Sequence, residues 1–125
     1  MMTPDQLSQF QHGLDLFNAG EFYDCHEVLE DLWNDLNGDE KRTVQGILQI
    51  AVGFYHLRTD NLSGARSLFR KALDKFEKYP TPHDFPLTIN PLIDSIRSLH
   101  SILNETGHLT PELIKQVPPV LAIRA

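Results

Sequence analysis

The segment from about Asp39 to Arg58 most constrains the fold, because apolar residues cover nearly the whole circumference of the helix that it predicts. Those residues are Val44, Ile47, Leu48, Ile50, Ala51, Val52, Phe54, Tyr55 and Leu57. A helix that is apolar nearly all round is usually central and buried. Gly46 and Gly53 lie seven apart on one line, where we expect a neighbouring backbone to approach closely.

Apolar residues at helical spacing, separated by turn signals, predict further helices around this one. Thr3-Pro4-Asp5-Gln6 is a capping sequence that starts the first helix, and Gly20 suits its end. The second runs over about 21–36 and the fourth over about 62–79, and a fifth starts at Asn90-Pro91. A short last helix starts at Thr110, and the apolar tail over 120–123 is expected to dock on the body.

The apolar pattern of residues 22–33 recurs forty residues later, over 62–73, and each copy follows a turn and an apolar helix. This echo indicates two stacked antiparallel helical hairpins with repeat-like packing. The length of 125 residues fits one domain. We therefore predict an all-α fold, a compact bundle of about five to six helices, as a single domain over residues 1–125.

The charge balance disfavours nucleic acid as a partner. Asp and Glu number 17 against 11 Lys and Arg, for a net charge of -6, whereas phosphate backbones are bound through clustered cations. The segment 21–40 holds eight acidic residues and no basic one, which predicts a solvated acidic face. The predicted fourth helix carries five cations, so an attraction between these two helices inside the fold is expected. Nucleic-acid binding through the fourth helix is a third hypothesis that rests on those cations alone.

A single cysteine, Cys25, allows no intrachain disulfide and suits a reducing cytoplasm. It falls in an apolar stripe, where a thiol is usually inert. The N-terminus lacks the pattern of a signal peptide, and no apolar run approaches the roughly 20 residues of a membrane helix. We expect a soluble, cytoplasmic protein without membrane contact.

Polar residues on the second and third predicted helices mark the candidate site. His26 and Glu30 are four residues apart and share one helix face. Because a short turn joins the two helices, they should run antiparallel, which brings Gln45 and Gln49 to the level of this pair. The full candidate set adds the flanking residues: His26, Glu27, Glu30, Trp33, Gln45, Gln49 and His56. The remaining histidines (His12, His83, His100 and His108) are expected at surface or capping positions.

Three interpretations of this set are open. The first is a structural layer in which His26, Glu30, Gln45 and Gln49 satisfy one another by hydrogen bonds. A second is a divalent metal site of His26, Glu30 and His56, although the two histidines are offset by six residues, or about 9 Å along the axis. A third is acid–base catalysis by His26 with Glu27 or Glu30.

Two segments carry a resemblance to a known family. They are Phe17-Asn18-Ala19-Gly20-Glu21-Phe22-Tyr23-Asp24-Cys25-His26-Glu27-Val28-Leu29-Glu30-Asp31-Leu32-Trp33 and Gln45-Gly46-Ile47-Leu48-Gln49-Ile50-Ala51-Val52-Gly53-Phe54-Tyr55-His56, followed by Asn61 and Gly64-Ala65. The chain resembles the bacterial, archaeal and plastid family known as domain of unknown function 309, over about residues 10–76. The resemblance implies a compact all-helical fold and no established activity, substrate or cofactor. Asp24 stands where the family pattern suggests Glu, which keeps the carboxylate.

The favoured hypothesis is a non-enzymatic domain that binds a protein or a small ligand, with no cofactor predicted. The alternative is a metal-dependent or acid–base enzyme, hydrolase-like, that uses His26, Glu30 and His56. In the alternative, these groups line a cavity open to solvent. The sequence leaves the oligomeric state open.

Overall fold

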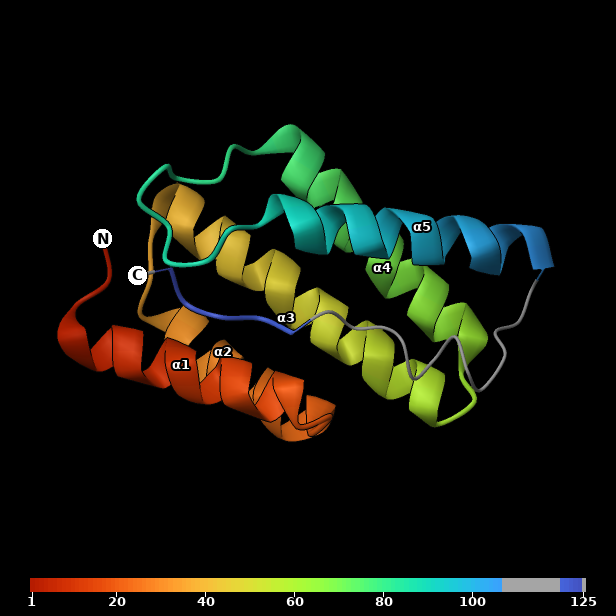
Figure 1. Ribbon diagram of the computed structural model, residues 1–125, viewed down its shortest axis with the longest axis horizontal. Helices are drawn as coiled ribbons and strands as arrows, with labels where there is room; N and C mark the ends of the chain where they lie inside the picture. The colour runs from red at the N-terminus through yellow and green to blue at the C-terminus, as the bar shows by residue number, and fades with distance from the viewer. Residues whose placement is uncertain (107–119, 125) are drawn as a thin grey trace.

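The computed structural model describes residues 1–106 and 120–124, and it confirms the all-α fold class (Figure 1). The helices within these ranges are α1 (Pro4–Asn18), α2 (Phe22–Asn34), α3 (Gly38–Arg58), α4 (Leu62–Lys78) and α5 (Asn90–Thr106). The described residues form no strand, and one isolated antiparallel bridge pairs Leu87 with Ile123. The helix predicted from Thr110 lies outside the described residues.

Each helix packs on the next along the chain, from α1 on α2 to α4 on α5. Helices α1 and α2 form one antiparallel hairpin and α3 and α4 form a second, stacked through the contact of α2 with α3 (Figure 1). This confirms the two predicted hairpins. Helix α3 has neighbours on two sides, as its apolar circumference requires.

Local sequence signals set several helix ends. The Thr3 hydroxyl accepts from the Gln6 backbone N–H, and the Gln6 side chain accepts from the Thr3 N–H, which completes the predicted capping box. The backbone is left-handed at Gly20, with φ +79°, a conformation that glycine adopts without a Cβ penalty. Asn61 caps α4 by accepting from the Gly64 N–H at 2.9 Å.

Aromatic rings build the centre of the core around α3. Phe54 stacks on Phe22 with ring centroids 5.2 Å apart, and it meets Phe69 edge-on at the same distance. The ring of Phe69 lies against Gly53, where an added Cβ would overlap it. The expectation of a close backbone neighbour at Gly53 is therefore corrected, because an aromatic side chain of α4 fills the space.

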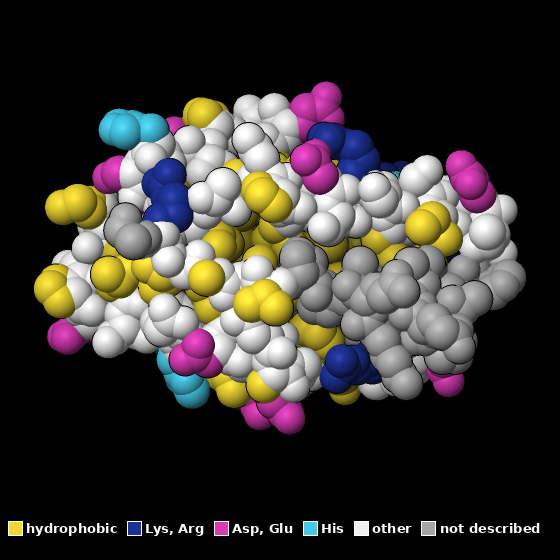
Figure 2. Space-filling view, in the orientation of Figure 1, with side chains coloured by type: hydrophobic (Ala, Val, Ile, Leu, Met, Phe, Trp, Pro, Cys, Tyr) yellow, Lys and Arg dark blue, Asp and Glu magenta, His cyan; other side chains and the backbone are white. Residues whose placement is uncertain are grey.

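The apolar tail docks on the body, as predicted. The backbone of Leu121 donates to the Asn18 Oδ1 at 2.8 Å and accepts from the Asn18 Nδ2 at 2.7 Å, and the Leu121 side chain is buried. Arg124 continues the contact, donating from its backbone to the Pro86 carbonyl at 2.7 Å. Figure 2 shows hydrophobic side chains along the middle of this face, with charged side chains mainly toward its edges.

The predicted attraction between α2 and α4 is wrong. Helix α3 lies between them, so α4 packs on α3 and α5 instead. Within the described ranges, no ion pair joins a carboxylate of α2 to a cation of α4. The same ranges hold no helix with the length and hydropathy needed to cross a bilayer.

Candidate functional site

A cleft of about 170 Å³ lies between α2 and α3. Its lining combines aromatic and apolar side chains with two imidazoles: Phe22, Tyr23, His26, Val52, Tyr55 and His56. The cleft is partly open to solvent, and Tyr23 at its edge is 55% exposed. It brings His26 and His56 from the predicted set to one place.

Helical spacing explains why these side chains converge. On α2, Phe22 and His26 are four residues apart, and on α3, Val52 and His56 are four apart. Residues at this spacing share one face of a helix. The two faces meet where α2 of the first hairpin packs on α3 of the second, so each helix supplies one wall.

A row of rings joins the two histidines of the cleft. The His26 and Tyr23 centroids are 5.8 Å apart, those of Tyr23 and Tyr55 are 5.5 Å apart, and those of Tyr55 and His56 are 5.9 Å apart. The histidines therefore stand at the two ends of a tyrosine pair rather than in contact. This arrangement accords with the axial offset expected between them.

His26 and Glu30 form the pair that their spacing predicts. The His26 Nε2 lies 2.9 Å from the Glu30 Oε2. The side chain of His26 is 26% exposed and that of Glu30 is 52% exposed. The carboxylate therefore accepts a hydrogen bond from the imidazole at the solvent-facing side of the cleft.

His56 is held from the start of α4. The Asn61 Nδ2 lies 3.2 Å from the His56 Nδ1. An amide N–H donates, so Nδ1 is the acceptor and the proton of the neutral ring is on Nε2. Because Asn61 also caps α4, the position of His56 is coupled to the turn between α3 and α4.

The structure separates the predicted polar layer. Gln45 faces α4, where its Oε1 accepts from the Lys75 Nζ at 2.5 Å. The Gln49 Oε1 is buried and has no hydrogen-bond partner among the described residues. The network of His26, Glu30, Gln45 and Gln49 is therefore wrong as predicted, and only its His26–Glu30 contact forms.

The other two candidates stand outside the cleft. Trp33 packs against the core, its buried Nε1 has no described partner, and Lys41 Nζ lies 4.4 Å from the ring centroid. Glu27 is exposed on α2. Neither side chain lines the wall that His26 shares with His56.

The geometry bears on metal binding and on thiol chemistry. Within residues 1–106 and 120–124, no three His, Cys, Asp or Glu side chains converge as a metal site would need. Cys25 is buried in the apolar stripe of α2. Burial raises the pKa of the Cys25 thiol to about 12, against a smaller opposing effect of a backbone hydrogen bond with Phe17. The predicted place of Cys25 in an apolar stripe is therefore confirmed, and the inertness of the thiol stays a prediction.

Four lining residues of the cleft were not among the candidates predicted from the sequence: Phe22, Tyr23, Val52 and Tyr55. The antiparallel pairing that places His26 at the level of Gln49 would also place Tyr23 near Gly53, two residues from Tyr55. Two aromatic residues at nearly the same level of adjacent helices were therefore the sequence signal for an aromatic wall. The prediction of the site used polar side chains alone, so it did not include these rings.

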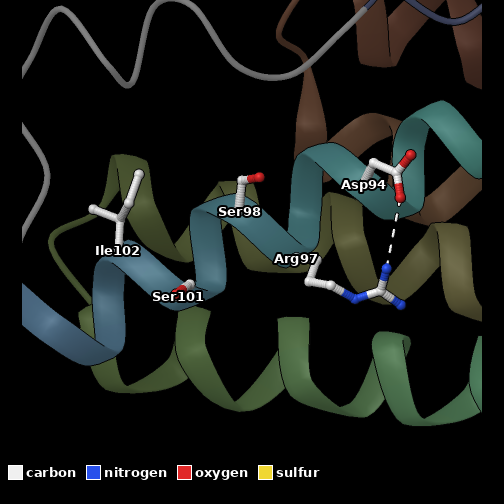
Figure 3. A pocket seen from close by; sticks show the side chains of 5 residues that line it. All are labelled: Asp94, Arg97, Ser98, Ser101 and Ile102. Carbon is white, nitrogen blue, oxygen red and sulfur yellow. Dashed lines mark ion pairs between the residues drawn. The ribbon is translucent and has the colours of Figure 1, made fainter.

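A second hollow, on α5, presents fewer side chains that are free to bind a ligand. Its described lining residues all come from that helix: Asp94, Arg97, Ser98, Ser101 and Ile102. Figure 3 shows Arg97 directed toward Asp94, and their ion pair spans 3.6 Å. The charges of this hollow are therefore compensated by each other, and no second helix contributes a described group.

Comparison with known proteins places the cleft within a family segment. Residues 10–68 match the family described as Domain of unknown function (DUF309), which confirms the resemblance over just under half of the chain. The uncharacterized protein YpuF of Bacillus subtilis (strain 168) is 37% identical over 54 residues, covering 42% of this chain and 31% of that protein. An uncharacterized protein of Aquifex aeolicus (strain VF5) is 28% identical over 58 residues, covering 46% of this chain and 17% of that protein. The chain thus spans less than a third of either relative.

Proposed function

We propose that this chain, whose residues 10–68 match domain of unknown function 309, is a non-catalytic protein-binding domain. Its cleft between α2 and α3 receives one apolar side chain of a partner segment. The observation that carries the proposal is the cleft itself, with an aromatic and apolar lining and a volume of about 170 Å³.

The size of the cleft favours a side chain over a free small molecule. Pockets for drug-sized ligands usually measure roughly 300–1,000 Å³, and this cleft is well below that range. Protein interfaces place single anchoring side chains in pockets of this kind, and aromatic residues are enriched around them. Phe22 and Val52 supply apolar contact, and the Tyr23 and Tyr55 rings supply a wall.

The charge around the cleft predicts a second property of the partner. Glu30 pairs with His26 beside the cleft, and Asp24 and Glu27 are exposed elsewhere on α2. These carboxylates outnumber the one cation among the described residues that contacts the lining, Arg58, whose guanidinium carbon lies 4.7 Å from the ring centroid of Phe22. Opposite charges across an interface speed association and select partners. We therefore expect the apolar anchor to be flanked by a Lys or Arg, and the binding to weaken as salt rises.

The matched relatives support a modular role. The shared segment makes up 31% of one relative and 17% of the other, so it occurs in proteins with much additional sequence. A binding domain can work within a longer protein, because it needs only its own binding surface and a partner. A cytoplasmic location stays a prediction, supported by the lone buried thiol of Cys25.

One observation favours the alternative of acid–base catalysis. The His26–Glu30 pair is 2.9 Å long and borders a solvent-open cleft that also contains His56, the geometry of an imidazole oriented by a carboxylate. A hydrolase screen separates the two functions. Turnover that disappears in His26→Ala, with the helical content unchanged, would establish the enzyme and refute the binding proposal.

The direct test is selection of peptides on the full chain from a random displayed library. We expect enrichment of peptides with a Phe, Trp, Leu or Met beside a basic residue. Val52→Trp fills the cleft and should abolish their binding. Ser98→Trp, at an exposed position of α5, is the matched control and should bind like the wild type.

Two results would contradict the proposal. One is the absence of any anchor pattern among the selected peptides. The other is equal binding to the wild type and to Val52→Trp, with circular dichroism showing that the variant is folded.

A further inference from the structure

A third hollow, of about 290 Å³, lies between α4 and α5, away from the aromatic cleft. Two arginines and three neutral hydrogen-bonding side chains line it: Arg66, Ser67, Arg70, His100 and Asn104. The first three come from α4 and the last two from α5. Unlike the hollow on α5 alone, this one is built by two helices that pack on each other.

The two arginines carry uncompensated charge. Arg66 and Arg70 are four residues apart and share one face of α4. Over residues 1–106 and 120–124, neither takes part in an ion pair. Like charges at this spacing repel each other, and no carboxylate is among the described residues that line the hollow. An anion between the guanidinium groups would remove this repulsion.

His100 is set up as a neutral donor. The Asn104 Nδ2 lies 3.4 Å from the His100 Nδ1, so Nδ1 accepts and the proton of the neutral ring is on Nε2. Burial lowers the pKa of His100, the charges of Arg70 and Arg66 lower it further, and Asp74 acts in the opposite direction. The lowered pKa favours the neutral ring, which retains one N–H.

We propose that this hollow is a binding site for a phosphate-type oxyanion. Guanidinium groups match the geometry of phosphate oxygens and donate charge-assisted hydrogen bonds. The Ser67 hydroxyl and the His100 Nε2–H add neutral donors from both helices. The site differs from general nucleic-acid binding, because it uses two of the five cations of α4 and places them against α5.

The remaining cations of α4 do not extend this site. Lys75 donates to Gln45 on α3, and Lys78 Nζ lies 5.5 Å from the ring centroid of Tyr79. Lys71 is exposed and does not line the hollow. The positive charge of α4 is thus divided among different faces, which favours a compact anion over an extended polyanion.

The test is a titration of the full chain with inorganic phosphate. Binding is monitored by NMR through the imidazole resonances of His100. We expect a saturable shift and a rise in the pKa of His100 when phosphate is bound, because the anion stabilises the imidazolium. Arg66→Gln and Arg70→Gln should each weaken binding about tenfold. Arg97→Gln, which removes a cation outside the hollow, is the control and should bind phosphate like the wild type.

A comparison of inorganic phosphate with glycerol 3-phosphate identifies the source of the anion. Tighter binding of the free ion points to phosphate itself, and tighter binding of the ester points to a phosphorylated metabolite. Either outcome supports the site.

Three results would overturn it. The first is that sodium chloride at matched ionic strength produces the same shifts, which would attribute them to charge screening. The second is unchanged phosphate binding in the Arg66→Gln, Arg70→Gln double variant. The third is an oligonucleotide that binds this face while phosphate neither binds nor competes, which would assign the arginines to a nucleic-acid surface.

Discussion

The cleft between α2 and α3 and the hollow between α4 and α5 differ in the side chains that line them and in their relation to the family segment. The cleft between α2 and α3 has an aromatic lining with carboxylates nearby, whereas the hollow between α4 and α5 is lined by arginines and neutral donors. Every lining residue of the cleft lies within residues 10–68, the segment that matches the family. Arg70, His100 and Asn104 of the second hollow lie outside it.

The comparison indicates which property belongs to the family segment and which to this chain. The cleft depends on the contact of α2 with α3, and both helices lie inside the matched segment. The second hollow needs α5 to pack on α4, and α5 follows the matched segment. We therefore expect relatives to share the aromatic cleft more widely than the anion site.

The largest effect should come from Phe54, because its ring connects the two halves of the core. It contacts Phe22 of the cleft on one side and Phe69 of α4 on the other. We expect Phe54→Ala to lower the free energy of unfolding by about 3–5 kcal/mol, measured by urea denaturation. Leu7→Ala, at a partly exposed position, is the control, with an expected change of about 0.5 kcal/mol or less. A loss below about 1 kcal/mol for Phe54→Ala would show that the halves are not joined through this ring.

Two asparagine–histidine contacts offer a matched comparison of smaller size. Asn61 contacts His56 and caps α4, whereas Asn104 contacts His100 without capping a helix start. We expect Asn61→Ala to lower the unfolding free energy by about 1 kcal/mol and Asn104→Ala to change it much less. Thermal unfolding of both variants checks this, and equal losses would contradict the capping role.

The second hollow should contribute an acid response through His100. The folded-state pKa of His100 is lowered by burial and by Arg70 and Arg66, so the unfolded chain takes up this proton first as the pH falls. Stability should therefore decrease as the pH falls through the unfolded pKa of about 6.5. In the Arg66→Gln, Arg70→Gln double variant the pKa of His100 should rise, which NMR titration of the imidazole measures. An unchanged pKa would remove the arginines from the environment of His100.

The smallest effect concerns the exposed pair beside the cleft. Glu30→Gln removes the carboxylate that accepts from His26, and pairs of this spacing and exposure contribute at most about 0.5 kcal/mol. The variant should unfold almost like the wild type while binding selected basic peptides more weakly. A large loss of stability would instead assign the pair to a structural role.

The fold was largely predictable because its determinants are local. The apolar stripes, the capping box at Thr3 and the turn at Gly20 each act within a few residues, and the structure contains all of them. The docking of the tail was also expected from its apolar composition, and Leu121 confirms it.

The candidate site was less predictable because its contacts are long-range. A helix that is apolar on nearly every side has several neighbours, so periodicity could not show that Gln45 faces Lys75 of α4 instead of α2. His100 was expected at a surface or capping position. The spacing of residues within α5 does not show that this helix packs on α4, so the contribution of His100 to a hollow could not be predicted. Tyr23 was missed because it lies outside the apolar stripe of α2 and becomes part of a wall only opposite Tyr55.

The most direct test of the two-site account is one set of amide and side-chain NMR titrations of the full chain. N-acetyl-phenylalanine amide represents an anchoring side chain, and inorganic phosphate represents the anion. The account predicts that the first probe shifts resonances of Tyr23, Val52 and Tyr55, and that phosphate shifts those of Arg70 and His100. Val52→Trp should abolish only the first response. Shifts of the first probe that are spread over the whole surface, or that persist in Val52→Trp, would contradict the claim that the α2–α3 cleft is a side-chain receptor.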